Sequence, residues 1–259
     1  MVSELDRFAA LVAHQPVPLG EASLLVASVV GHPAEVDHGL RVLDDLAEGV
    51  EGTTLEAVVE HVFGRVGLQG DRTDYYHPDN SLLPAVLERG RGNPVSLAIV
   101  AVDVARRVGA PASVVGMPGH VLIGDGPTPE RWVDGFDGGR WLDRDGARLR
   151  FAQLHGPSAA FDAAYLEATP DIAVMARVLT NLLVVFRRVG DARRSLRVLR
   201  LRAAIPVLGD QERPLLAAAY EAVGRYPEAA TVWRQVQAAG GPAADAAEAH
   251  AERLRSRLN

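Results

Sequence analysis

The stretch GNPVSLAIVAVDVARRVG, residues 92–109, decides the fold of this chain. Its second residue is Asn93, a good N-cap, and the next is Pro94, which suits the first position of a helix. Nearly every residue after them is apolar until two arginines and Gly109 close the run. Because a helix that is apolar on almost all sides is buried, the sequence predicts a central helix inside the core over residues 93–108.

Short β-branched or aromatic segments follow this helix and are divided by Gly and Pro, the pattern of an antiparallel meander. A central helix followed by consecutive strands indicates an α+β fold and argues against a parallel, doubly wound sheet. The expected strands cover residues 112–116, 120–123, 131–136 and 140–142.

Helical patterns and one long loop precede the central helix. The helix before the loop begins at a cap signal, Thr53 or Thr54 before Glu56. Residues 70–81 are rich in turn formers and make a loop that is long for a compact domain, so the loop is either disordered or functional. Its two tyrosines and its histidine argue against disorder. The expected helices cover residues 1–13, 21–30, 35–46 and 54–66.

From about Pro170 the strands stop and the chain is helical, which places an expected domain boundary between residues 1–168 and 169–259. Gly190 and Gly224 each end one helix, and they lie 34 residues apart, the tetratricopeptide period. Two units are fewer than the about three that a free solenoid needs, so this region is expected to lean on the first domain. An ordinary helical bundle is the alternative. The expected helices cover residues 171–189, 192–204, 212–223, 227–239 and 243–258.

The residue types that the chain lacks exclude whole classes of chemistry. It has no Cys, which excludes disulfides, thiolate metal sites and thiol nucleophiles. It has no Lys, which excludes Schiff-base chemistry and a Walker-type phosphate lysine. The histidines show no metal-ligand spacing, so neither a metal nor another cofactor is expected.

Composition also indicates where the protein works. No apolar run approaches the about 20 residues that span a bilayer, and no basic n-region opens the chain. We therefore expect a cytoplasmic protein that does not enter membranes. The high content of Ala and Arg is typical of a GC-rich bacterial genome.

The net charge of −6 is unevenly distributed. Acids far outnumber arginines in residues 1–60, whereas seven arginines lie in residues 187–202. A solvated helix face accounts for such a cluster, and the alternative is a docking surface for an acidic protein or peptide. No aromatic residues are interleaved with these arginines, which argues against nucleic acid as the partner.

Three side chains are placed to form a catalytic triad. Ser96 lies near the start of the central helix, His120 opens a strand, and Asp134 lies on the next strand. This order suits a nucleophile, a base and an orienting acid. Each has a structural alternative as well. Ser96 suits backbone hydrogen bonding in a first helical turn, a lone His is usually structural, and Asp134 suits turn initiation with Gly135.

The order of helix, Gly-Ala-Pro, strand, His, strand and Asp resembles the transglutaminase-like superfamily, whose triad is Cys, His and Asp. More narrowly, the chain resembles the bacterial SirB-type family, which joins a divergent transglutaminase-like domain to a tetratricopeptide-like tail. The resemblance covers nearly the whole chain. It is carried by residues 74–76 (DYY), 80–83 (NSLL), 86–87 (VL), 91–97 (RGNPVSL), 105–109 (ARRVG) and 117–120 (MPGH).

The resemblance implies that His120 and Asp134 take the His and Asp positions of the triad, and it puts the superfamily's Cys on Pro94, which has no nucleophile. It therefore implies a non-enzymatic or degenerate protein that binds a protein or peptide. The alternative is a serine-type hydrolase or acyltransferase in which Ser96 attacks, His120 is the base and Asp134 orients it. That mechanism predicts a hydrogen bond between Ser96 Oγ and a ring nitrogen of His120.

Residues around the long loop and the helix start are the expected binding residues. Asn80 could offer its amide at the edge of a pocket. The alternative is that Asn80 and Ser81 hold the loop by side-chain-to-backbone hydrogen bonds. The expected binding residues are Tyr76, Asn80, Ser81, Asn93 and Pro94.

Overall fold

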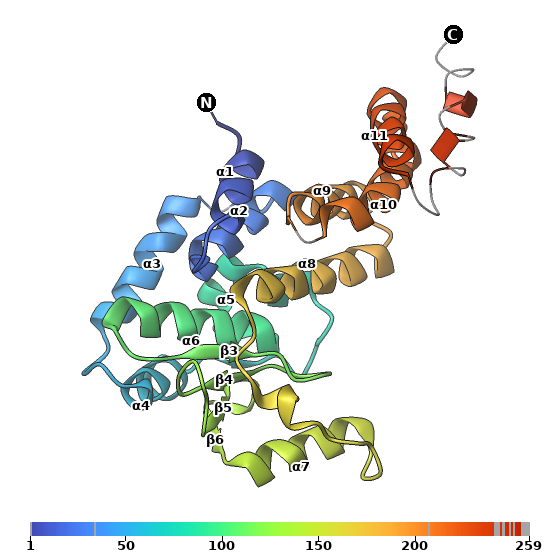
Figure 1. Cartoon of the computed structure of the whole chain (residues 1–259). Coiled ribbons are helices and arrows are strands. Elements are labelled where there is room, and N and C mark those ends of the chain that lie inside the picture. The colour runs from blue at the N-terminus through green and yellow to red at the C-terminus, as the bar shows by residue number, and fades with distance from the viewer. Residues whose placement is uncertain are drawn as a thin grey trace.

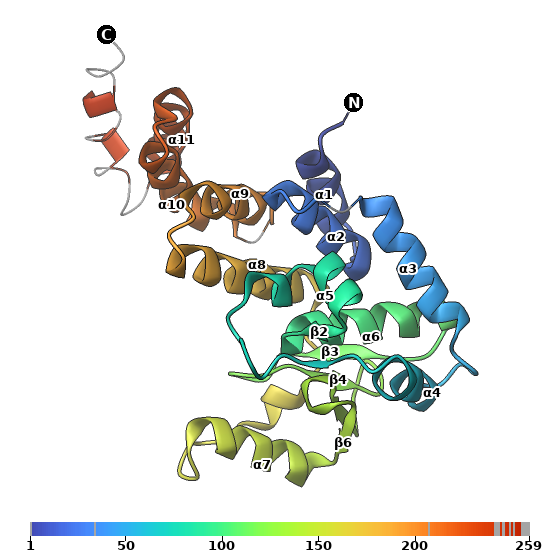
Figure 2. The same ribbon diagram turned by 180° about the vertical axis from the view of Figure 1, so that it is seen from behind.

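The structure is a computed structural model that describes residues 2–33, 35–206, 208–240, 244, 247, 248, 250 and 252–254. The predicted central helix is α6, Pro94–Val108. Asn93 caps it, Gly109 ends it in the left-handed conformation with a φ of 77°, and all residues from Pro94 to Ala105 are buried. Figures 1 and 2 show α6 lying across one face of a small sheet. The prediction of a buried core helix is confirmed.

The sheet is the predicted antiparallel meander, with the strand order β3-β4-β5-β6. The first and third strands are shorter than predicted, the second is shifted toward its C-terminal end, and the fourth has the predicted bounds. At Asp134 the side chain accepts a hydrogen bond from the Asp137 N–H, and Gly135–Asp137 forms a 3₁₀ helix, η3, in place of the last residues of the predicted strand. His120 lies before β4 and not in it. The strands are β3 Ser113–Val115, β4 Leu122–Gly124, β5 Trp132–Asp134 and β6 Arg140–Leu142.

The predicted helices of the first 66 residues are present with shifted ends. Thr54 is the N-cap that the sequence indicates, and its hydroxyl accepts a hydrogen bond from the Ala57 N–H. The helix after it continues as a π-helix, η1. The bounds are α1 Glu4–Val12, α2 Leu19–Val30, α3 Val36–Glu48, α4 Leu55–Val59 and η1 Glu60–Arg65.

Several elements are absent from the sequence-based prediction. The long loop contains a 3₁₀ turn, and a short parallel strand pair brings its start beside the residues that precede α6. A helix, α7, lies beyond β6 on the side of the sheet away from α6 (Figure 1). The additional elements are β1 Gln69–Gly70, η2 Pro78–Ser81, α5 Leu83–Arg89, β2 Arg91–Gly92, α7 Arg144–His155 and η4 Ala163–Leu166.

The last part of the described chain is helical, as predicted. Gly190 and Gly224 end α8 and α10 with nearly equal φ angles of 74° and 76°. Helices α8 and α9 pack against α2, and α8 also packs against α6, so this region leans on the first part of the chain. The expected helix over 243–258 lies mostly outside the described residues. The bounds are α8 Asp171–Arg188, α9 Ala192–Ala203, α10 Gly209–Ala222 and α11 Tyr226–Ala239.

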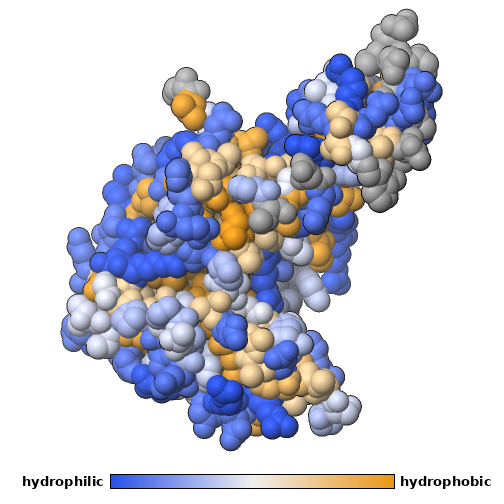
Figure 3. All heavy atoms as spheres, viewed as in Figure 1, coloured by the Kyte–Doolittle hydropathy of each residue, from blue (hydrophilic) through white to orange (hydrophobic). Residues whose placement is uncertain are grey.

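The larger of two apolar clusters runs from Phe8 in α1 through α6 to Trp233 in α11. A smaller, separate cluster joins the sheet to α7 and η4 through Val115, Leu122, Trp132, Ala147 and Leu166. In the space-filling view the outline is indented between α8 and α7 (Figure 3). Among the described helices, none combines the length and the apolar character that crossing a membrane requires.

Candidate functional site

The His and Asp singled out in the sequence lie side by side. Nε2 of His120 is 3.0 Å from Oδ1 of Asp134, and both residues are buried. Arg150, from α7, donates from Nε at 2.8 Å and from Nη2 at 2.6 Å to Oδ2 of the same carboxylate. The Asp137 N–H fills the remaining position on Oδ1. Both carboxylate oxygens of Asp134 are therefore fully engaged inside the protein.

Asp134 is held in its charged form. Burial alone raises the pKa of this carboxyl, but the hydrogen bond and charge of His120, together with Arg150, bring the pKa below its usual range. A carboxylate can only accept, so Nε2 of His120 carries the proton. In the neutral form of the ring, Nδ1 is then the nitrogen left to act as a base, and it makes no hydrogen bond with any residue that the structure describes.

Ser96 does not join this pair. Its hydroxyl donates to the carbonyl oxygen of Asn80 at 2.7 Å and accepts from the Asn93 N–H at 3.1 Å. The Ser96 N–H in turn donates to Oδ1 of Asn93 at 3.0 Å, which completes a capping box. Within the described chain no hydrogen bond links Ser96 and His120, so the contact that a serine mechanism requires is missing. Pro94 is buried at the first turn of α6.

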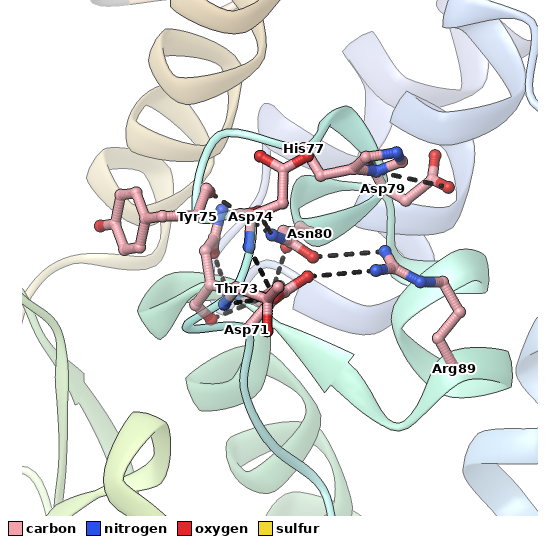
Figure 4. A network of polar contacts seen from close by, with 10 residues as sticks. Asp71, Thr73, Asp74, Tyr75, His77, Asp79, Asn80 and Arg89 are labelled. Carbon is pink, nitrogen blue, oxygen red and sulfur yellow. Dashed lines mark hydrogen bonds and ion pairs between the residues drawn. The ribbon is translucent and has the colours of Figure 1, made fainter.

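The long loop is held by a polar network (Figure 4). Asp71 accepts from the backbone N–H groups of Thr73 and Asp74, at 3.1 and 3.0 Å, and from Nη2 of Arg89 at 3.1 Å. These contacts, led by the Asp74 N–H, hold the pKa of Asp71 below its usual range. Arg89 also donates from Nη1 to Oδ1 of Asn80 at 3.2 Å. One guanidinium thus ties both ends of the loop to α5.

The amide of Asn80 serves the loop itself. Nδ2 of Asn80 donates to the carbonyl oxygen of Asp74 at 2.7 Å, and the backbone carbonyl oxygen of Asn80 accepts from the Asn93 N–H. Nδ2 of Asn93 donates to the hydroxyl of Ser81 at 2.7 Å. Asn80, Ser81 and Asn93 are all buried. Asn80 therefore makes the side-chain-to-backbone hydrogen bond of the loop-holding alternative, whereas the Ser81 hydroxyl accepts from the Asn93 side chain. Both residues lie at the start of α6.

Tyr76 differs from the other expected binding residues because half of it, 50%, is exposed. Its ring meets Tyr75 edge-on at 5.2 Å between centroids, and Tyr75 meets Phe136 at 5.9 Å. Phe136 in turn lies 6.2 Å from the His120 ring. We call Tyr75, Tyr76 and Phe136 the aromatic row. It leads from the surface to the buried His–Asp pair.

The aromatic row also touches the helical region. Figure 4 shows the Tyr75 side chain pointing away from the polar network toward the start of α8. The guanidinium of Arg188, at the other end of α8, lies over the Tyr76 ring at 4.6 Å from its centroid. Burial raises the pKa of the Tyr75 hydroxyl, with Tyr76 acting in the same direction and Arg177 against it.

Sequence reasoning missed the two arginines that organise this site, Arg150 and Arg89. Arg150 comes from α7, a helix that the sequence pattern did not indicate. Arg89 precedes Gly90, which ends α5 in the left-handed conformation. The arginine before this glycine was a usable signal for a helix end. In the part of the chain that the structure describes, no cluster of His, Asp and Glu has the geometry of a metal site.

Residues 2–180 match the family described as the transglutaminase-like superfamily. The chain belongs to this superfamily. It is 38% identical over 135 residues to a UPF0162 protein of Xylella fastidiosa, a match that covers 49% of this chain and 47% of that protein. The chain thus spans about half the length of this curated relative. It is also 32% identical over 189 residues to a UPF0162 protein of Pseudomonas aeruginosa, covering 70% and 69%.

These relatives support the bacterial origin that the composition indicates. Among solved structures, the crystal structure of menin, described as revealing the binding site for Mixed Lineage Leukemia protein, aligns with a TM-score of 0.42 and 11% identity, over 91% of this chain and 70% of menin. A likeness at this level carries no conclusion about function.

Proposed function

We propose that this chain is a non-catalytic member of the transglutaminase-like superfamily that binds a protein or peptide partner. One observation carries the proposal. The orienting acid and the base nitrogen are present, but Ser96 is engaged in a capping box and Pro94 stands where the superfamily has its Cys. A base without a nucleophile in hydrogen-bond reach has nothing to activate.

The aromatic row supports binding as the role of this surface. Tyr75 and Tyr76 keep 44% and 50% of their surface exposed although neighbouring side chains hold their rings in place. Tyrosines of this kind are enriched at protein interfaces because they present a large apolar area and a polar tip with little entropy to lose.

We further infer the finer assignments that the sequence suggests. The chain is a SirB-type protein of the cytoplasm, with a transglutaminase-like domain over 1–168 and a tetratricopeptide-like region over 169–259. Two features support the repeat. Gly190 and Gly224 share a left-handed conformation at the repeat spacing, and helices α8 to α11 pack in succession.

The first test is reaction with a fluorophosphonate probe, with the labelled residue located by mass spectrometry. We expect no label on Ser96, and we expect the labelling to be the same in the Ser96→Ala and His120→Ala variants. Ser96→Ala is instead expected to lower the free energy of unfolding by about 1 kcal/mol, because α6 loses a cap. A known serine hydrolase labelled in parallel controls for the probe. Labelling at Ser96 that disappears in His120→Ala would falsify the proposal and establish the serine mechanism.

The second test asks whether the aromatic row meets a partner. A photo-cross-linking benzoylphenylalanine replaces Tyr76 in one variant and Val66 in another. Val66 is the matched control because it is similarly exposed, at 45%, and follows η1. We expect a discrete cross-linked product in cells from position 76 only. The product should persist in Ser96→Ala and disappear when Tyr75 is changed to Ser. Equal cross-linking from both positions would count against the proposal.

A further inference from the structure

A groove of about 310 Å³ lies on the helical region, between the end of α8, one side of α9 and one side of α10. Leu199 and Leu215 contribute its largest apolar side chains, and alanines of α10 line the rest. Leu215 is 44% exposed, so a large apolar side chain is accessible at the surface of the groove. The small alanines leave room beside it. The groove is thus an accessible apolar surface.

Ser195 adds a second, independent feature. It lines the groove from α9, and only 7% of the residue is exposed. Its hydroxyl is buried and makes no hydrogen bond with any described residue. A buried hydroxyl without a hydrogen-bond partner is unfavourable, because it has lost its bonds to water and gained none inside the protein. Helix packing alone leaves this polar group unsatisfied, directly under a groove that a ligand could enter.

The charge at the groove is positive. Arg187 lines it at the C-terminal end of α8, is exposed, and makes no ion pair or hydrogen bond with a described residue. Its neighbours are different. Arg188 stacks on Tyr76, Arg194 lies 3.7 Å from Asp191, and Arg202 is bound to Glu212 at 2.6 Å. Among the arginines of this region, Arg187 is the one that both lines the groove and is free for a carboxylate.

We propose that this groove binds an acidic peptide segment, with an aliphatic side chain entering between Leu199 and Leu215 and a neighbouring carboxylate pairing with Arg187. A volume of about 310 Å³ is at the lower end of the about 300–1,000 Å³ of ligand pockets, which suits one or two side chains. The unpaired positive charge selects an acidic segment over a neutral or basic one. The inference rests on the proposed binding function and names the class of partner.

The test is fluorescence anisotropy of the full chain with a labelled synthetic peptide of alternating Glu and Leu residues. Two matched peptides carry Ser in place of Leu, or Lys in place of Glu. We expect binding of the Glu–Leu peptide only. Binding should weaken as salt rises, because an exposed charge pair is screened.

Two pairs of variants then locate the site. Leu215→Glu is expected to weaken binding of the Glu–Leu peptide at least about tenfold, since it removes a buried aliphatic contact and adds a like charge. Val66→Glu, at a similarly exposed position outside the groove, should leave affinity unchanged. Arg187→Glu should also weaken binding about tenfold. Its control is Arg193→Glu, a change at another exposed arginine that does not line the groove. Circular dichroism verifies that each variant is folded.

Three results would overturn the groove assignment. These are equal affinity for the Glu–Leu and Lys–Leu peptides, unchanged affinity of both Leu215→Glu and Arg187→Glu, or no binding at any peptide concentration. Self-association of the chain that Leu215→Glu abolishes would assign the groove to a second copy and reject the acidic peptide. If cross-linking from position 76 persists while the peptide test fails, only this inference is lost. Loss of both would remove the proposed binding function as well.

Discussion

Replacing Asp134 by Ala is expected to lower the free energy of unfolding by about 3–5 kcal/mol, the usual cost of removing one partner from a buried ion pair. The carboxylate accepts from His120, from Arg150 and from the Asp137 N–H. In the variant all three donors lose their acceptor. His120 is 5% exposed and Arg150 only 23% exposed in its side chain, so water replaces the carboxylate poorly. Urea denaturation at neutral pH measures the loss.

The same residue predicts how stability depends on pH. The pKa of Asp134 is lowered in the folded protein, so the unfolded chain binds the proton more tightly. The stability that this group contributes is therefore fully present above its unfolded pKa of about 3.9 and is lost as the pH falls through the lower, folded value. The free energies of unfolding of the wild type and of Asp134→Asn should differ most near neutral pH and become similar at acid pH.

Asp137→Ala is the matched control for Asp134→Ala. This neighbouring aspartate pairs with Arg72 and Arg140, but its side chain is 29% exposed. An exposed ion pair contributes about 0–1 kcal/mol to stability. Asp137→Ala should therefore lower the free energy of unfolding much less than Asp134→Ala does. A loss below about 1 kcal/mol for Asp134→Ala would mean that the buried contacts of Asp134 with His120 and Arg150 do not stabilise the fold.

The elements that local sequence signals define are the ones that could be predicted. Asn93, Pro94 and Gly109 mark the ends of α6, and Gly and Pro mark the turns of the meander. Helix α7 has end signals too, Asp143 as its N-cap and Gly156 as its C-cap, but the residues between them give little sign of a helix. Only Ala147 and Phe151 of its residues are buried, so its sequence lacks the apolar period that identifies a helix. Its position depends on the sheet against which it packs.

The candidate site likewise has features that the sequence could predict and features that it could not. The strand order, which the sequence indicates, brings β4 beside β5, but His120 lies before β4, so its contact with Asp134 also depends on the turn that precedes β4. The binding of Arg150 to Asp134 could not be predicted, because it requires the place of α7. Ser96 is similar. Its first-turn position was predictable, but its acceptor, the Asn80 carbonyl, lies 16 residues away and is brought near by the loop network. Long-range contacts of this kind decide between a nucleophile and a capping residue.

Removing the carboxylate of Asp171 is expected to lower the free energy of unfolding by about 3 kcal/mol. Asp171 begins α8, and its Oδ1 accepts from Nη2 of Arg106 at 2.7 Å. Its Oδ2 accepts from the buried Val17 N–H at 3.0 Å, and Arg106 also donates to the Val17 carbonyl. Asp171→Ala leaves this N–H unsatisfied and the arginine unpaired.

The contacts of Asp171 with Arg106 and Val17 join α8, α6 and the segment before α2. Removing them therefore tests whether the helical region is part of the main core. Met175, Val178 and Leu182 of α8 lie in the same apolar cluster as α6. We therefore expect Asp171→Ala to unfold in a single transition at lower urea, with hydrogen exchange accelerating in α6 and α8 together.

Asp191→Ala provides the control at a second aspartate. Asp191 caps α9 by accepting from the Arg194 N–H at 2.8 Å, and its side chain is 32% exposed, so its loss should cost about 1 kcal/mol. Two separated transitions in Asp171→Ala, with α8 exchanging freely while α6 stays protected, would contradict a shared core. The helical region would then be an independent folding unit that the Asp171 contacts attach to the rest of the chain. A single transition would instead mean that the helical region and the main core unfold together. Because binding to the native state stabilises everything that unfolds with the binding site, a partner bound on α8 would then stabilise the whole chain, including the His120–Asp134 pair.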